Sequence, residues 1–428
     1  MTAPLHFDVQ RHRLANGLRV NLHHDDRLPL ASVNLWYHVG SKNERPGQTG
    51  FAHLFEHLLF QGSQHVDTNG HFRYIQQVGG LVNGSTWYDR TNYYETVPSH
   101  HLDRALWLES DRMGFLLPTM TQQKLDTQRE VVINERRQRV DNQPYGAAWE
   151  RLSEMLFPEG HPYRWPVIGY MEDLEVARLD MVSDFFSRFY GPNNAVLTLA
   201  GDLPENVMDR VEAWFGDLPA GPPVERPHVE PVVLDGPKRQ VVEDDVQLTK
   251  IYLAWHGPPY GRPEWYAGDL LAAVLAGGKS SVLREDLIYR RRLAKDVSCQ
   301  MLPTELCGTF ALVATVRPGV DPAQLESALM DHLSVVAGGV MAQAQVDRAR
   351  NKLLTYHYDE LETLGSRADA ISQFTTFFDD PEAAAHEPER YLPLGPEELS
   401  GFARERLQEQ RMAVLWVVPA ETATGDTE

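Results

Sequence analysis

The sequence predicts an α+β fold made of two related domains, each a mixed, mostly antiparallel β-sheet packed with helices. Both halves of the chain alternate strand-like segments, turn signals and helical periodicity. A proline-dense segment, residues 218–238, lies near the middle and reads as an extended linker. The second half also repeats the order of elements of the first. We therefore expect a first domain at 1–217 and a second at 239–428.

In the first half, the clearest elements follow from local signals. An Asn16-Gly17 pair between two alternating segments is typical of a hairpin with a two-residue turn. Residues rich in Thr and Tyr around small turn residues predict two further strands within 81–97. The remaining expectations are a strand at 31–39, helices at 50–60, 69–78, 98–113, 121–140, 147–156 and 181–190, and a buried strand at 195–200.

The repeat is weak residue by residue, but its order is consistent. The segment 249–257 resembles 31–40, and 267–277 can be laid over 52–62. In that overlay, every ionisable group of the first helix is replaced: His53, Glu56 and His57 fall on Gly268, Leu271 and Ala272. One domain is therefore expected to carry chemistry that the other lacks.

Composition excludes several classes of protein. The 428-residue chain has a formal net charge of -20, which argues against nucleic-acid binding because phosphates require a basic surface. It contains no 18-residue apolar run, so no membrane span is expected, and its two cysteines suggest no disulfide framework. We see no signal peptide and expect a cytoplasmic protein, or a periplasmic or secreted one if a leader was trimmed.

The helix expected at 50–60 carries the motif His53-Leu-Phe-Glu-His57. His53 and His57 are four residues apart, so both imidazoles leave the same face, and Glu56 is angularly close. A lone histidine on an apolar face is usually a satisfied core residue. Three ionisable groups among Leu, Phe and Ala cost desolvation unless a metal cation compensates. The spacing is that of the inverted zinc-peptidase motif.

A catalytic zinc ion usually takes three protein ligands and leaves a fourth position for water. Glu135 is the best third ligand, because it shares a helix face with Gln128 and Val132, whereas Glu130 lies well off that face. The alternative is that Glu135 is a solvated helix position. Glu56 is then free to act as general base, taking a proton from the attacking water and later delivering it to the leaving amine.

An ordered set of motifs over nearly the whole chain resembles the pitrilysin family, which includes insulin-degrading enzyme and the mitochondrial processing peptidase. The length matches its short, two-repeat bacterial members. The resemblance rests on His53-Leu-Phe-Glu-His57, Gly79–Thr86, Thr91–Tyr94, Gln128–Glu135, Asn142–Gly146, His161-Pro-Tyr163, Leu275–Leu283 and Leu293–Val297.

This resemblance implies Zn²⁺ held by His53, His57 and Glu135, with Glu56 as base. It implies that the chain is half of a clamshell whose two chains enclose a chamber. Peptide substrates are expected to add as a strand along an edge lined by Asn83, Gly84 and Ser85, although these could be ordinary strand and turn residues. Many relatives have a glutamate behind the third ligand where this chain has Gln128, so zinc affinity or rate can differ.

The resemblance also implies an Arg and a Tyr that hold substrate, and no such pair stands out in the second half. We therefore expect a related two-repeat partner subunit to supply it, which favours a heterodimer over a homodimer. The sequence predicts a zinc endopeptidase acting on peptides or unfolded polypeptides. The alternatives are a non-catalytic or weakly active scaffold subunit of a peptidase complex, and a zinc hydrolase of another substrate class.

Overall fold

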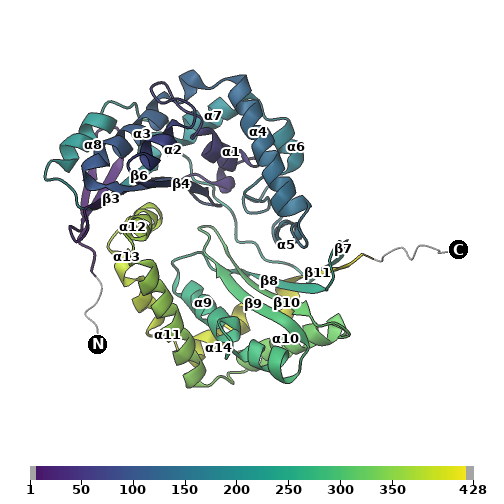
Figure 1. Ribbon diagram of the computed structural model, residues 1–428. Coiled ribbons are helices and arrows are strands. Elements are labelled where there is room, and N and C mark those ends of the chain that lie inside the picture. The colour runs from purple at the N-terminus through teal and green to yellow at the C-terminus, as the bar shows by residue number, and fades with distance from the viewer. Residues whose placement is uncertain (1–5, 421–428) are drawn as a thin grey trace. The chain divides into compact units, whose positions relative to one another are not determined.

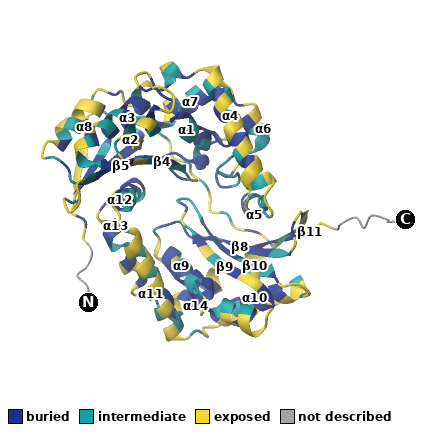
Figure 2. Ribbon diagram, viewed as in Figure 1, coloured by how far each residue is buried: buried dark blue, intermediate teal, exposed yellow. Residues whose placement is uncertain are grey.

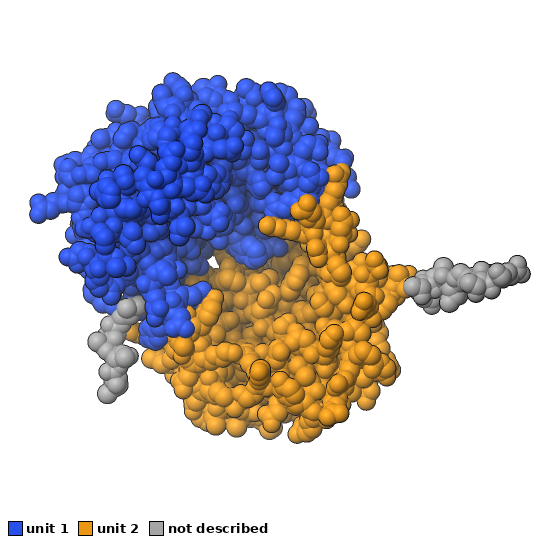
Figure 3. Space-filling view, in the orientation of Figure 1, with its two compact units in different colours: residues 1–136, 165–227, 357–387 blue, residues 137–164, 228–356, 388–428 orange. Residues whose placement is uncertain are grey.

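The computed structural model describes residues 6–420 and divides into two compact units (Figure 3). Unit 1 consists of residues up to 136, 165–227 and 357–387. Unit 2 consists of 137–164, 228–356 and the chain from 388 onward. Each unit contains one β-sheet and several helices, so the predicted α+β class is confirmed. No helix in the described part of the chain is long and apolar enough to cross a membrane.

The sheet of unit 1 has six strands in the order β1-β2-β6-β3-β5-β4, so β4 is an outer strand. β2 and β6 are parallel, and every other neighbouring pair is antiparallel. The bounds are β1 Gln10–Arg13, β2 Arg19–His24, β3 Leu30–Tyr37, β4 Leu81–Thr86, β5 Thr91–Pro98 and β6 Ala195–Gly201.

Alternation along the strands gives this sheet two different faces. On β3, Val33, Leu35 and Tyr37 join a large apolar core beneath one layer of helices. That layer consists of α1 Phe51–Leu58, α2 Gly70–Gln76, α3 Leu102–Phe115, α4 Gln122–Arg136, α6 Met171–Glu175, α7 Leu179–Phe189 and α8 Val207–Phe215. The opposite face is covered by α12, Leu364–Phe378, which packs on β3 and β6 (Figure 1).

The sheet of unit 2 has five strands in the order β7-β11-β8-β10-β9. Their bounds are β7 Lys238–Asp244, β8 Lys250–Gly257, β9 Ala294–Leu302, β10 Gly308–Val316 and β11 Met412–Pro419. The helix α9 packs on β9 and β10, while α5 packs on β8 and β11. The helices of this unit are α5 Ala148–Leu156, α9 Pro263–Ala276, α10 Pro322–Ala337, most of α11 Gln343–Glu360, and α14 Pro396–Arg406, whereas α13 Ala383–His386 belongs to unit 1.

The two sheets share one topology. In each, a parallel pair is followed by three antiparallel partners, so β2, β6, β3, β5 and β4 correspond in order to β7, β11, β8, β10 and β9. In each, a buried helix follows the central strand: α1 follows β3, and α9 follows β8. The relation between the two halves therefore lies in the strand order, which survives where side-chain similarity has faded.

The compact units differ from the continuous domains expected at 1–217 and 239–428. Residues 137–164 belong to unit 2, and residues 357–387 belong to unit 1. Each transferred segment brings a helix, α5 or α12, that covers one face of a sheet formed by the other half of the sequence. Helical periodicity shows that such a helix has a buried face, but it does not show which sheet buries that face.

Local expectations agree with the structure in most places and differ in three. The helix at 50–60 is shorter than expected, because α1 ends at Leu58. The helix expected at 121–140 ends at Arg136 and continues as a π-helical turn over 137–141. The β1–β2 hairpin encloses residues 14–18 instead of a two-residue turn, with Gly17 at φ 95°. From the predicted linker, residues 219–234 form neither helix nor strand.

A fully buried charged cluster joins α3 to the sheet of unit 1. Arg112 donates to Glu95 Oε1 at 2.9 Å and also bonds Glu109. Its guanidinium carbon lies 4.4 Å from the centre of the Tyr93 ring and 5.1 Å from that of Phe60. Burial, together with Glu109, raises the pKa of Glu95 well above its ordinary value, although Arg112 opposes that shift. Arg112 thus supplies a positive charge and hydrogen bonds to the two buried carboxyl groups of Glu95 and Glu109.

We expect Arg112→Met to lower the free energy of unfolding by about 3–5 kcal/mol, because it leaves two buried carboxyl groups without their cation. The control is Arg73→Met, which removes an exposed ion pair with Asp67 and is expected to cost far less, because solvent screens that pair. Urea denaturation of both variants measures the two costs. Equal, small losses would contradict a stabilising role for the cluster.

Two histidines in unit 2, the buried His161 and the half-buried His256, lie against Phe157. The rings of His161 and His256 have centroids 4.4 Å and 5.1 Å from that of Phe157. Burial lowers the pKa of each histidine to about 4. The proximity of His256 lowers the pKa of His161 further, and the charge of Lys238 does the same for His256. His161 Nδ1 accepts a hydrogen bond from the backbone N–H of Tyr163 at 3.1 Å. Both rings are therefore held neutral in the folded chain at neutral pH.

The free energy of unfolding is expected to fall as the pH drops from about 6.5 toward 4. In that window the unfolded histidines bind protons and the folded ones do not, so each contributes a slope of about 1.4 kcal/mol per pH unit. Urea denaturation at pH 7, 6 and 5 measures the slope. His161→Gln should make the slope shallower, and an unchanged slope in this variant would contradict the assignment.

Candidate active site

The start of α1 is fixed by a buried carboxylate. Glu44 accepts hydrogen bonds from the backbone N–H groups of Gly50 (2.9 Å) and Ala52 (2.8 Å), which are donors that the first turn of a helix leaves without an internal partner. Gly50 has φ 85°, and a Cβ at this position would lie 2.6 Å from the carbonyl oxygen of Ile168. The helix that carries the motif therefore begins at a rigidly defined point.

The structure brings the three predicted ligands together. His53 and His57 lie one turn apart on α1, and Glu135 lies in the last turn of α4, which packs against α1. Glu135 Oε2 is 3.3 Å from His57 Nε2, and Glu135 Oε1 is 3.8 Å from His53 Nε2. One candidate ligand atom from each residue lies within 4.8 Å of the others. In the described chain this is the one group of at least three such residues with this geometry.

The neighbours of Glu135 show why this residue is presented to α1. Glu130 is exposed, whereas Glu135 is only partly accessible, so the structure separates the two candidate carboxylates. The following residue, Arg136, is buried and donates to the carbonyl oxygen of Gly169 at 2.8 Å. This contact anchors the end of α4. Val131, next to the buried Val132 in the sequence, is 43% exposed.

Glu56 faces the outer strand of the sheet. Its Oε2 accepts a hydrogen bond of 2.6 Å from Thr86 Oγ1 at the end of β4. Burial raises the pKa of Glu56, while the Thr86 hydroxyl, His57 and Arg90 act in the opposite direction. Gly84 packs directly against it, because a Cβ on Gly84 would lie 3.2 Å from Glu56 Cγ. The carboxylate is therefore oriented by the strand and does not belong to the group around Glu135.

The donor set fits a zinc ion. Two imidazoles and a carboxylate are ordinary ligands of a catalytic zinc site, and bonds of about 2.0–2.1 Å in tetrahedral geometry place ligand atoms roughly 3.3 Å apart. The separations of 3.3 and 3.8 Å between Glu135 and the two imidazoles are close to that value. All three side chains are partly accessible, at 13–22% of their surface. A small ligand can therefore reach them.

The residues expected to line the substrate edge lie on β4 and alternate between its faces. Gly84 is buried against α1, whereas Asn83 and Ser85 point to the other face, where they oppose Tyr94 and Asn92 of β5. Leu81, at the start of the strand, is 76% exposed. Because β4 is an outer strand, its other edge pairs with no strand of the sheet.

In unit 2 the corresponding helix, α9, is closed by apolar packing. The positions laid over His53, Glu56 and His57 are Gly268, Leu271 and Ala272, and all three are buried. A Cβ on Gly268 would lie 2.7 Å from the Phe402 ring on α14, so this position has no room for a larger side chain. Where the second half lacks the ionisable residues, apolar packing fills the space that their side chains would need.

Sequence reasoning missed several residues around the site. Thr86 orients Glu56, Glu44 caps α1, and Arg90 lies beside the end of β4. Glu44 lies six residues before Gly50, and an acidic residue before a predicted helix is the signal that could have located it. Gln128 is buried on α4, seven residues before Glu135, and its effect on the ligands stays a prediction.

Comparison with known proteins identifies the family. The family model described as Insulinase (Peptidase family M16) matches residues 19–162, and the model described as Peptidase M16 inactive domain matches residues 177–353. The chain belongs to the pitrilysin family of M16 peptidases. The first match contains all four motif residues, and the second covers much of unit 2.

Individual relatives agree with this assignment. A protein from Helicobacter pylori described as zinc protease PqqE is 27% identical and aligns over 95% of this chain and 92% of its own length. The crystal structure of a protease from Helicobacter pylori superimposes with a TM-score of 0.91 at 26% identity, covering 96% of this chain and 100% of the other. The periplasmic protease PqqL from Escherichia coli shares the fold, with a TM-score of 0.77 and 17% identity. This chain covers 48% of that protein.

Proposed function

We propose that this M16 chain is a zinc-dependent endopeptidase that hydrolyses peptides or unfolded polypeptides. The observation that carries the proposal is the convergence of His53, His57 and Glu135, with Glu56 held beside them by Thr86. A scaffold subunit has no need of these four residues, and α9 shows what the same position becomes when they are absent. The similarity to a protein described as a zinc protease supports the same activity.

The mechanism assigns a separate task to each group. His53, His57 and Glu135 would hold the ion, and bound zinc would supply Lewis-acid polarisation of the substrate carbonyl and a lowered pKa for a water molecule. Glu56 takes a proton from the water that attacks the peptide carbonyl and delivers it to the departing amine. Thr86 holds the Glu56 carboxylate at 2.6 Å and so limits its rotation while it exchanges the proton.

The outer strand β4 is the proposed binding edge for substrate. An extended peptide that pairs with it satisfies the edge's backbone groups and places alternate side chains on its two faces. Asn83, Gly84 and Ser85 form this edge one to three residues before Thr86, the residue that orients the base. The main-chain geometry of β4 would then fix how far the scissile bond lies from Glu56.

We further infer that the chain pairs with a related two-repeat subunit to enclose a chamber. The support is that the chain corresponds in fold to about half of the longer PqqL protein. A second chain of the same architecture would supply the other half, and a different subunit is favoured over a second copy. Native mass measurement of the complex isolated from its own cells distinguishes a heterodimer from a homodimer.

We expect Glu135→Gln to weaken zinc binding at least tenfold, because it replaces the charged ligand with a neutral amide. The matched control on the same helix is Glu130→Gln, which should leave zinc affinity unchanged because Glu130 is exposed and outside the cluster. Titration with a competing zinc chelator measures both affinities. Equal affinities in the two variants would show that Glu135 is not a ligand.

Glu56→Gln is expected to retain zinc and to lose peptide hydrolysis by a factor of about 10² or more, because the amide cannot accept the proton. The assay is a quenched peptide library, measured with and without chelator, beside metal analysis of the same sample. If the Glu56→Gln variant still hydrolyses peptides, Glu56 is not the general base. A zinc-loaded wild-type chain that cleaves nothing, alone or in its native complex, would support the non-catalytic alternative.

A further inference from the structure

The face of β4 turned away from Glu56 is connected to α12 by a chain of hydrogen bonds. Asn92 of β5 lies opposite Ser85 in the register and accepts from the Ser85 hydroxyl at 2.7 Å. Arg90, in the turn between the two strands, donates to Ser85 Oγ at 2.5 Å and to Asn92 Oδ1 at 3.1 Å. These bonds hold together the end of β4, the following turn and the start of β5.

Asp369 of α12 is the acceptor on which these residues converge. Its Oδ1 receives hydrogen bonds from Asn92 Nδ2 at 2.9 Å, Trp36 Nε1 at 2.7 Å and Asn34 Nδ2 at 3.1 Å. One carboxylate oxygen therefore ties the two strands β3 and β5 to the helix. Asn92 uses its amide nitrogen toward Asp369 and its amide oxygen toward Ser85 and Arg90, so the orientation of this amide depends on the carboxylate.

Charge strengthens the same connection. The Arg90 guanidinium carbon lies 5.4 Å from the centre of the Trp36 ring. The Trp36 side chain lies on the face of the sheet that α12 covers, where it also donates to Asp369. Burial lowers the pKa of Arg90, whereas the negative charges of Asp369 and Glu56 favour its charged form. Removal of the Asp369 carboxylate takes away one of the anions that compensate this half-buried cation, and three donors lose the acceptor that they share.

We propose that Asp369 is a positioning residue that fixes the end of β4, and with it the substrate edge and the Thr86 hydroxyl that orients Glu56. Ser85 lies between Gly84 and Thr86, the two residues of β4 that contact Glu56. A displacement of Ser85 therefore moves both of these contacts. This role in hydrolysis rests on the proposed function, whereas the ordering of β4 does not.

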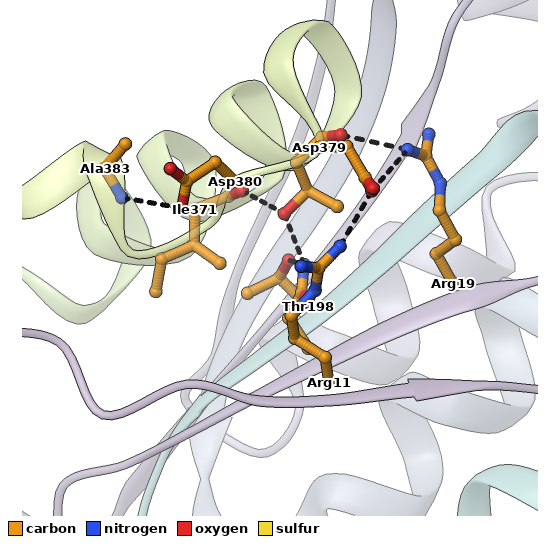
Figure 4. A network of polar contacts seen from close by, with 9 residues as sticks. Arg11, Arg19, Thr198, Ile371, Asp379, Asp380 and Ala383 are labelled. Carbon is orange, nitrogen blue, oxygen red and sulfur yellow. Dashed lines mark hydrogen bonds and ion pairs between the residues drawn. The ribbon is translucent and has the colours of Figure 1, made fainter.

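The other end of α12 supplies a matched control. Thr375 Oγ1 accepts from Asn21 Nδ2 of β2 at 2.8 Å, and Asp379 at the end of the helix pairs with Arg11 at 2.8 Å (Figure 4). Because β2 and β4 lie on opposite sides of β6, β3 and β5 in the sheet, these contacts hold the same helix without reaching the active site. Thr375→Val removes two buried hydrogen bonds, the one from Asn21 and the one to the carbonyl oxygen of Ile371, and preserves the shape of the side chain.

The first test needs neither metal nor substrate. Hydrogen–deuterium exchange is followed in peptides covering residues 81–92 for the metal-free wild type, Asp369→Ala and Thr375→Val. We expect exchange in this segment to be at least tenfold faster in Asp369→Ala, and to match the wild type in Thr375→Val. Unchanged exchange in Asp369→Ala, or the same acceleration in both variants, would overturn the proposal.

The second test uses hydrolysis by the zinc-loaded protein. Asp369→Ala should lower kcat/KM at least tenfold at unchanged zinc content, and Thr375→Val should stay within about twofold of the wild type. Asp369→Asn keeps an oxygen that can accept the three bonds, so we expect it to recover most of the loss. No recovery would contradict positioning by hydrogen bonds. A wild type without hydrolysis contradicts the proposed function and leaves the exchange test valid.

Discussion

The position of the Glu135 carboxylate opposite two imidazoles is the constraint on which unit 1 depends. His53 and His57 can meet it only if α1 and α4 cross with the last turn of α4 beside the middle of α1. Both helices are accordingly fixed at their ends: Glu44 holds the start of α1, and Arg136 holds the end of α4. Immediately after Arg136, the chain leaves unit 1. Glu135 therefore lies in the last turn of α4, which Arg136 anchors, just before the chain passes from unit 1 into unit 2.

The second unit shows how little of the fold the chemistry requires. Its sheet has the same order and the same pattern of parallel and antiparallel pairs, and its helix α9 follows the corresponding strand. At this helix the chemical difference lies in the side chains, because Gly268 stands where unit 1 has His53 and the Phe402 ring packs against it. An apolar helix in this place is stable by burial alone. The ionisable groups of α1 instead require compensation, which is the physical reason to expect a cation there.

Features that depend on residues close together in the sequence could be predicted, whereas contacts between distant residues could not. The motif on α1 could be predicted because two histidines and a glutamate within five residues have only one arrangement on a helix. Glu135 could be preferred over Glu130 because its helix face was readable from Gln128 and Val132. The pairing of Ser85 with Asn92 was implicit in the two strands predicted within 81–97. Asp369, in contrast, lies 277 residues from Asn92, and no local pattern links them.

For the same reason, the sequence did not show that α5 packs on the sheet of unit 2 and α12 on the sheet of unit 1. Helical periodicity marks a buried face but not the sheet that buries it, so continuous domains were the natural expectation. The polar character of the α12 face was a usable signal, because Asp369, Ser372 and Thr375 recur every three residues on one side of the helix. All three are tied to the sheet of unit 1: Asp369 by the bonds described above, Ser372 by Thr198 and Thr375 by Asn21.

A polar contact of this kind has a consequence that an apolar one lacks. Apolar packing tolerates small sliding of a helix over a sheet, whereas hydrogen bonds of 2.7–3.1 Å to four different strands permit one register. The helix therefore aligns β2, β6, β3 and β5 with respect to each other. Because β4 has a strand neighbour on one side only, it inherits its position from β5. The outer strand that faces Glu56 is therefore held in place from the far side of the sheet.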